Sequence, residues 1–434
     1  MSDKILEFGQ KQAIVYDGIT YTYSQLHDKI KELKGGILKC IKNKVVAILG
    51  DYSFLSIASF FALYENHNII VPITNTVKEE IQSRLDEAFC EFSIAPDDGL
   101  RLVNLECNET HEMIEKLKRE NHAGLVLFSS GSTGKPKAMV HDLDILMRHY
   151  DGKRQKSLNM LVFLMFDHIG GINTLLNILS IGSTAIIARN RDPDEICKLL
   201  QDHRIMILPS SPTFLNLILM SGAHKRYDLS ALRMITYGTE TMSESLLERL
   251  KTQFPKVKFL QTFGTSETGI ASTSSKDSTF MKIDDKDLEY KIVDNELWLR
   301  SKTQIVGYLN APMDSFTDDG WFKTGDLVQL GEDGGIKIIG RSKEVINVGG
   351  QKVLPSEVES VIFELDAVKD VMVSAEKSTI IGQMVVAKIV LNKEISKSEI
   401  LRHCISKLDK FKVPAKIEFV DEIKFNPRFK KQRL

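Results

Sequence analysis

An apolar run passes directly into a loop of glycines, hydroxyls and lysines in Gly124-Leu125-Val126-Leu127-Phe128-Ser129-Ser130-Gly131-Ser132-Thr133-Gly134-Lys135-Pro136-Lys137. Glycine lets a backbone approach a ligand closely, and amide and hydroxyl groups donate to anions. The loop is not a Walker A motif, because Ser129 replaces its first glycine and Pro136 its Ser or Thr. A solvated turn is the alternative for such a loop taken alone. The preceding strand and the Lys-Pro-Lys extension favour a phosphate cradle.

The pattern around this loop predicts parallel sheets in the first part of the chain. Apolar runs of strand length alternate with helix-length periodic segments, with strands expected at 45–50, 68–73, 124–128, 184–188 and 205–208 and a helix at 55–64. Alternating elements of this kind form parallel sheets covered by helices on both faces. Residues 75–122 show little of the pattern, so we expect this region to be trimmed.

Beyond about Ile283 the pattern changes twice. Short alternating segments, including a hairpin at 327–339, predict a small β-rich subdomain. A helix at 355–364, strands at 368–374 and 384–390 and a helix at 397–408 then predict a separate α+β unit. The predicted fold is therefore α/β, with a large N-terminal body of residues 1–340 and a mobile C-terminal lid domain of residues 341–434.

Composition narrows the classes of partner. The 434 residues are 43% apolar, and 57 Lys and Arg nearly balance 58 Asp and Glu. The chain therefore has no excess positive charge to bind nucleic acid, and we expect its partner to be a small molecule. The five cysteines are scattered without a Cys-x-x-Cys pair, which argues against disulfides or a zinc cluster and favours the cytoplasm. No apolar run is long enough for a membrane span, and no secretion signal is expected at the N-terminus.

Two more motifs, joined to the loop, carry a family resemblance. They are Phe263-Gly264-Thr265-Ser266-Glu267 and Trp321-Phe322-Lys323-Thr324-Gly325-Asp326. Over essentially its whole length the chain resembles the ANL superfamily, which comprises acyl- and aryl-CoA synthetases, peptide-synthetase adenylation domains and firefly luciferase. The loop departs from the family form only at Ala138, where the family has glycine.

The resemblance implies an ATP site. Glu267 would hold Mg²⁺, which prefers carboxylate and phosphate oxygens, and Asp326 and Arg341 would contact the ribose. The remaining nucleotide contacts implied are Ser129, Ser130, Gly131, Ser132, Thr133, Gly134, Lys135, Lys137, Gly238, Thr239, Phe263, Gly264, Thr265 and Ser266.

The resemblance also assigns roles in the lid. Lys430 corresponds to the adenylation lysine, with Phe429 in place of a glycine and Lys431 as a neighbour that could be confused with it. Lys343 corresponds to the hinge. Gly349 and Gly350 would border the path of the thiol.

His168 corresponds to a gate or carboxylate neighbour of the acid pocket, whereas Asp167 keeps an amino-acid substrate open. We expect an ATP- and Mg²⁺-dependent ligase that joins a carboxylic acid to coenzyme A. One alternative is a stand-alone adenylation protein that loads an acyl, aryl or amino acid onto the phosphopantetheine of an acyl carrier protein. The other, suggested by Ala138 and Phe429, is a weakened nucleotide-binding protein without turnover.

Overall fold

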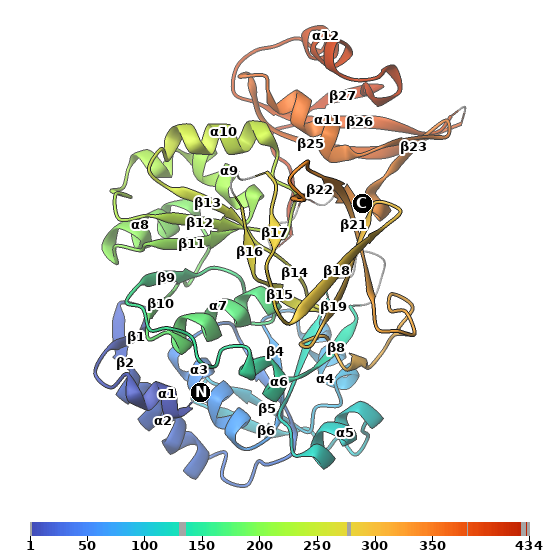
Figure 1. Cartoon of the computed structure of the whole chain (residues 1–434). Helices are drawn as coiled ribbons and strands as arrows, with labels where there is room; N and C mark the ends of the chain where they lie inside the picture. Colours follow the sequence, from blue (N-terminus) through green and yellow to red (C-terminus); the bar gives the residue numbers. More distant parts are fainter. Residues whose placement is uncertain (1, 130–135, 276–278, 380, 427–430, 432–434) are drawn as a thin grey trace.

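A computed structural model describes residues 2–129, 136–275, 279–379, 381–426 and 431. Two seven-stranded sheets and a β-rich region form the body, and the C-terminal residues pack above them (Figure 1). Among the described residues, no helix is both long and apolar enough to cross a bilayer. The mixed α/β class with a large parallel-sheet body and a small α+β C-terminal domain is confirmed.

The first sheet has the strand order β13-β12-β11-β9-β10-β1-β2. Its pairs are parallel except for the β1–β2 hairpin. The strands are β1 (Gln12–Tyr16), β2 (Ile19–Thr22), β9 (Asn159–Val162), β10 (Thr184–Ile187), β11 (Ile207–Ser210), β12 (Met234–Tyr237) and β13 (Lys258–Gln261).

The second sheet has the order β20-β8-β7-β4-β3-β5-β6. Its centre is parallel, whereas β6, β8 and β20 are antiparallel to their neighbours. The strands are β3 (Val45–Leu49), β4 (Ile69–Ile73), β5 (Phe92–Ala95), β6 (Arg101–Asn104), β7 (Gly124–Phe128), β8 (Ala138–Asp142) and β20 (Gly307–Tyr308).

The central strands of both sheets are buried on both faces, which explains their nearly continuous apolar runs. Between the sheets, one core joins Val46 and Ile48 of β3 to helices that include α3 and α7. On the outer face of the second sheet, Val45 and Ala47 pack with residues of α4 and α5. The helices of the body are α1 (Ser2–Glu7), α2 (Tyr23–Gly35), α3 (Phe54–Glu65), α4 (Lys78–Glu87), α5 (Glu112–Glu120), α6 (Leu143–Arg148), α7 (Ile169–Ser180), α8 (Pro193–Asp202), α9 (Pro212–Ser221), the single turn η1 (Ala223–Lys225) and α10 (Glu244–Gln253).

Residues 75–122 show little of the alternating pattern in the sequence, yet they hold regular elements. This region holds α4, β5, β6 and α5, and β5 joins the sheet parallel to β3. The elements escaped detection because they carry a weak apolar signal: Leu85 is the only residue of α4 that is buried, and β5 has only four residues. The N-terminal body therefore keeps both sheets.

The β-rich region begins earlier than predicted, at Phe263. Two short hairpins lead into a four-stranded antiparallel sheet of order β18-β19-β21-β22. The predicted hairpin at 327–339 is confirmed by β21 and β22. The strands are β14 (Phe263–Thr265), β15 (Gly269–Ala271), β16 (Thr273–Ser274), β17 (Lys282–Ile283), β18 (Leu288–Val293), β19 (Glu296–Ser301), β21 (Phe322–Leu330) and β22 (Ile336–Arg341).

The C-terminal sheet has the order β24-β23-β26-β25, with β27 paired to β26. The helix α11 (Pro355–Phe363) lies between this sheet and α10, where the Arg249 guanidinium is 4.9 Å from the ring centre of Phe363. The 3-10 turn η2 (Ser342–Glu344) leads into it and contains Lys343, which is exposed. The other elements are β23 (Ile346–Val348), β24 (Gln351–Val353), α11 (Pro355–Phe363), β25 (Val368–Ser378), β26 (Gly382–Leu391), α12 (Lys397–Lys407), η3 (Lys410–Lys412) and β27 (Lys416–Phe419).

Candidate active site

The predicted phosphate loop leaves β7 and returns at β8. Its two ends are tied together, since the Ser129 amide donates to the Lys137 carbonyl at 3.0 Å and the Lys137 amide donates to the Ser129 hydroxyl oxygen at 3.0 Å. The predicted contacts Ser130, Gly131, Ser132, Thr133, Gly134 and Lys135 lie outside the described residues. The adjacent antiparallel strands therefore fix where the loop starts and ends.

Asn310, just after β20, reinforces the exit of the loop. Its amide nitrogen donates to the Pro136 carbonyl at 2.9 Å, and its side-chain oxygen accepts from the Ala138 amide at 2.8 Å. One side chain thus satisfies two backbone groups that the irregular chain would otherwise leave to water.

The β14–β15 hairpin presents Glu267 at its turn. The Thr265 hydroxyl accepts from the Thr268 amide at 3.1 Å, and the Ile305 amide donates to the Glu267 carbonyl at 2.8 Å. The Tyr308 hydroxyl donates to Glu267 Oε1 at 3.2 Å. Burial and the neighbouring Glu267 carboxylate raise the pKa of Tyr308, so this hydroxyl stays protonated and can donate.

Tyr308 also contacts the end of the phosphate loop. The Lys137 ammonium lies 4.7 Å from its ring centre, within the range of a cation–π contact. Lys137 and Glu267, predicted from separate motifs, are therefore brought together by a single aromatic side chain.

Two predicted glycines stand where the backbone passes close to a neighbour. A Cβ on Gly264 would lie 2.6 Å from the Gly269 carbonyl oxygen, across the β14–β15 hairpin. A Cβ on Gly238 would lie 2.8 Å from the Thr262 carbonyl oxygen, just before Phe263. The turn at Gly238 and Thr239 therefore packs directly on the segment that leads to Glu267.

The predicted ribose contacts Asp326 and Arg341 face each other across β21 and β22. Arg341 Nε lies 2.9 Å from Asp326 Oδ1, and the aspartate is buried whereas the arginine is half-exposed. The turn before Asp326 has a structural role as well, since the Thr324 hydroxyl oxygen accepts from the Asp326 amide at 2.9 Å. The Arg341 guanidinium thus pairs with a buried carboxylate across the two strands.

His168 caps the N-terminus of α7, where its Nδ1 accepts from the Gly170 amide at 3.0 Å. The adjacent Asp167 is buried, and its Oδ2 lies 3.4 Å from Nη1 of Arg84 on α4. The Arg84 guanidinium in turn lies 5.6 Å from the ring centre of Phe128, the last residue before the phosphate loop. The Asp167 carboxylate is thus paired with a partly buried arginine.

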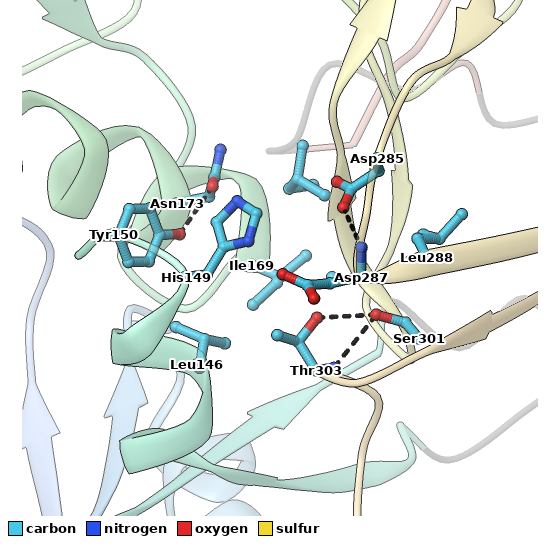
Figure 2. Close-up of a pocket in the computed structure, with 12 residues that line it drawn as sticks. Leu146, His149, Tyr150, Ile169, Asn173, Asp285, Asp287, Leu288, Ser301 and Thr303 are labelled. Carbon is cyan, nitrogen blue, oxygen red and sulfur yellow. Dashed lines mark hydrogen bonds between the residues drawn. The ribbon is translucent and has the colours of Figure 1, made fainter. Parts of the chain in front are cut away.

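A cavity lies between the helices that follow β8 and β9 and the strands of the β-rich region (Figure 2). It holds about 390 Å³ including its open mouth, and Ile169 of α7 faces the strands of the β-rich region across it. On the helical side the Tyr150 hydroxyl donates to the Asn173 side chain at 2.7 Å. The lining residues are Leu146, His149, Tyr150, Ile169, Asn173, Gly269, Ile270, Asp285, Asp287, Leu288, Ser301 and Thr303.

The C-terminal tail reaches the body near the Gly238 turn. The Lys431 amide donates to Glu240 Oε1 at 3.3 Å, while its ammonium lies 2.7 Å from Asp370 Oδ1 of β25. The same ammonium donates to the Val371 carbonyl at 2.7 Å. Lys430, the predicted adenylation lysine, lies outside the described residues.

Gly349 and Gly350 form the turn between β23 and β24, both with positive φ. The Asn347 side chain closes this turn by accepting from the Gly350 amide at 2.9 Å.

The described residues fit the groups that the motifs imply. Glu267 offers a carboxylate held by the hydroxyl of Tyr308, whose ring also carries the Lys137 ammonium, as expected for an oxygen-ligated Mg²⁺ next to phosphates. Asp326 offers a buried acceptor of the kind that binds ribose hydroxyls. The glycines at Gly238 and Gly264 allow the backbone segments next to Glu267 to pack closely on one another.

Sequence comparison defines the class. The AMP-binding enzyme family matches residues 2–304, and the AMP-binding enzyme C-terminal domain matches residues 357–430. The chain therefore belongs to the AMP-binding enzyme family, the adenylate-forming ANL enzymes that its motifs resemble.

Individual relatives cover nearly the whole chain. The 2-succinylbenzoate–CoA ligase of Listeria monocytogenes serotype 4b is 26% identical over 95% of this chain and 93% of its own length. The anthranilate CoA ligase AuaEII, solved with anthranoyl-AMP, shares the fold with a TM-score of 0.84 at 20% identity, covering 100% of this chain and 95% of its own. The o-succinylbenzoate CoA synthetase of Bacillus subtilis, solved with ATP and magnesium, has a TM-score of 0.79 at 21% identity, covering 99% and 98%.

Three residues at the site were not predicted: Tyr308, Asn310 and Arg84. The first two belong to Gly307-Tyr308-Leu309-Asn310, a short polar and aromatic segment between longer motifs. Arg84 lies on a helix whose apolar signal is weak. The sequence indicates a site role for these residues only through the aromatic and amide side chains of the 307–310 segment, which lies before the Thr-Gly-Asp motif.

Proposed function

We propose that this protein is an acid–CoA ligase that forms AMP. The carboxylate oxygen of the acid attacks the α-phosphorus of ATP, the bond between the α- and β-phosphates breaks, and pyrophosphate leaves. The thiol sulfur of coenzyme A, having lost its proton, then attacks the acyl carbon, and the bond to AMP breaks. The observation that carries the proposal is the meeting of Lys137 and Glu267 at Tyr308, in a chain that matches both regions of the family.

One set of proposed site residues binds the nucleotide. Lys137, Ser129 and the rest of the predicted loop bind the phosphates, and Glu267 ligates Mg²⁺, which neutralises charge on the triphosphate when bound. Asp326 and Arg341 orient the ribose. Gly238, Thr239 and Phe263 border the adenine. Holding acid and nucleotide in one orientation supplies much of the rate by proximity.

Lys430 is the proposed catalytic lysine. An ammonium directed at the α-phosphate stabilises the negative charge that builds up as the carboxylate attacks, and loss of such a donor costs about 10²- to 10³-fold in rate. The adjacent Lys431 is engaged with Asp370 and Val371, which leaves it poorly suited to this role. The lid of residues 341–434, turning at Lys343, would carry Lys430 away and bring Gly349 and Gly350 to the thiol.

The acid is proposed to be an acyl or aryl acid rather than an amino acid. The α-ammonium group of an amino acid would need a carboxylate as its ion-pair partner. The Asp167 carboxylate already pairs with the Arg84 guanidinium at 3.4 Å, which disfavours this role. His168 would border the acid's carboxylate. Ile169 and Ile270, which line the adjoining cavity, supply apolar surface for its tail.

The test is a panel of aliphatic, aryl and amino acids assayed for acid-dependent exchange of pyrophosphate into ATP. Acids that give exchange are then offered coenzyme A or a phosphopantetheine-bearing carrier protein. Thioester formation with coenzyme A supports the proposal. Transfer to the carrier protein alone would favour the adenylation-protein alternative, and exchange with none of the acids would favour a nucleotide-binding protein.

A further inference from the structure

Tyr308 lies at the junction of three segments that are distant in sequence. It sits on β20, which pairs with β8 in the register Tyr308–Met139, directly after the phosphate loop. Its side chain is 3% exposed, and its ring packs against Phe316 at 6.4 Å between ring centres. The ring is therefore fixed by the core, and its hydroxyl points at a single acceptor, Glu267 Oε1.

We propose that Tyr308 is a positioning residue for the metal: its hydroxyl fixes one oxygen of Glu267 so that the other can ligate Mg²⁺, and its ring holds the Lys137 ammonium beside the same ion's phosphate ligands. The inference rests on the proposed role of Glu267. A carboxylate whose orientation is fixed by a second residue binds a metal with less loss of rotational freedom, and loss of such a partner typically lowers metal affinity about 10- to 100-fold.

The charges support this arrangement. The Lys137 ammonium lies over the ring of Tyr308 and the Glu267 carboxylate at its hydroxyl, and among the described residues no ion pair joins the two, so the carboxylate is not already paired with this ammonium. A hydroxyl donor neutralises less of that charge than an ammonium would. Tyrosine therefore aligns Glu267 without competing with the cation.

The test compares Tyr308→Phe with the wild type and with Tyr64→Phe. Tyr64 is a matched control because its hydroxyl also donates to a carboxylate, Asp144 Oδ1, at 3.0 Å. Mn²⁺ binding is measured by electron paramagnetic resonance in the presence of a non-hydrolysable ATP analogue, and the Mg²⁺ dependence of pyrophosphate exchange is measured in parallel. Binding of the analogue in EDTA and the melting temperature report on the metal-free site and the fold.

For Tyr308→Phe we expect metal affinity to fall about tenfold or more, with analogue binding in EDTA unchanged and kcat recovered at high Mg²⁺. Tyr64→Phe should leave metal affinity unchanged. Unchanged metal affinity in Tyr308→Phe, or an equal loss of metal-free analogue binding, would overturn the inference. Glu267→Gln distinguishes failure of this inference from failure of the proposed role of Glu267. If Glu267→Gln lowers the metal affinity and Tyr308→Phe does not, only the role of Tyr308 fails. If neither variant lowers the metal affinity, the proposed role of Glu267 fails as well.

Discussion

Gly264→Ala is expected to disable the enzyme while leaving it folded. The added Cβ would lie 2.6 Å from the Gly269 carbonyl oxygen and 2.7 Å from the Ile270 Cα, both backbone atoms that cannot rotate away. Ordinary contact begins near 3.4 Å, so the two strands of the hairpin must separate by about 0.8 Å. Overpacking of this kind costs about 1–3 kcal/mol.

The displacement falls on the turn that presents Glu267. A shift near 1 Å in a positioning group can lower the rate about 10²-fold, so we expect acid-dependent pyrophosphate exchange to fall by about that factor, with a higher Mg²⁺ requirement. Thermal unfolding, followed by circular dichroism, should show a modest drop in melting temperature and one cooperative loss of structure.

Gly35→Ala is the matched control for this substitution. Gly35 ends α2, and a Cβ there would meet no atom within 4 Å. Alanine is favoured over glycine in a helix by up to about 1 kcal/mol, so this variant should keep full activity and equal or higher stability. Wild-type exchange by Gly264→Ala at ordinary Mg²⁺ would refute the claim that this hairpin sets the position of Glu267.

Three further predictions concern charge. Burial lowers the pKa of His141 to about 4 from an ordinary 6.5, so as the pH falls the unfolded chain binds a proton at this histidine before the folded chain does. The free energy of unfolding in urea should therefore drop by about 3 kcal/mol between those two pH values, relative to His141→Leu. The same pH dependence of unfolding in both proteins would contradict this. Asp167→Asn removes the buried charge that faces the partly buried Arg84 guanidinium. Its other carboxylate neighbour, Glu80, is exposed and 4.0 Å away, so the substitution should cost about 3 kcal/mol in urea unfolding. A change below 1 kcal/mol would show that the pair is solvated. Lys431 docks the C-terminal tail on Asp370, so Lys431→Met, which loses this one charge-assisted contact, should slow pyrophosphate exchange about tenfold. Thioester formation from a synthetic acyl-adenylate should be unchanged. An equal loss in both assays would contradict a role of Lys431 in docking the tail.

The elements that the sequence predicts well are those buried on both faces. The strand at 124–128 is found at those residues because every position is apolar and buried. The strand expected at 205–208 begins two residues later, at Ile207, since the apolar run includes Ile205, which is buried in the core before the strand starts. The elements of 75–122 were missed because their one-sided burial leaves few apolar residues to reveal a period.

The site could be predicted in its motifs but not in the contacts that join them. Glu267 and Tyr308 are 41 residues apart, and Ala138 and Asn310 are 172 apart. Pairings of this range depend on strand order, in this case β20 beside β8, which no local pattern encodes. The same holds for Arg84 and Asp167, which meet because α4 packs beside the end of β7.

The sequence also does not reveal that the His168 side chain binds a backbone amide. His168 was predicted as a neighbour of the acid, and the structure adds a cap on α7 through Nδ1. The proposal that His168 borders the acid's carboxylate does not depend on this nitrogen. A side chain with two polar atoms can satisfy both roles, so the local fold and the proposed chemistry do not compete.

The central claim, that this protein joins an acid to coenzyme A through an adenylate, is tested most directly by following the fate of α-labelled ATP. With an accepted carboxylic acid and coenzyme A, the account predicts AMP and pyrophosphate in amounts equal to the acyl-CoA formed, and acyl-AMP when coenzyme A is left out. Release of ADP and phosphate in their place, or AMP formation that does not depend on any acid, would contradict it.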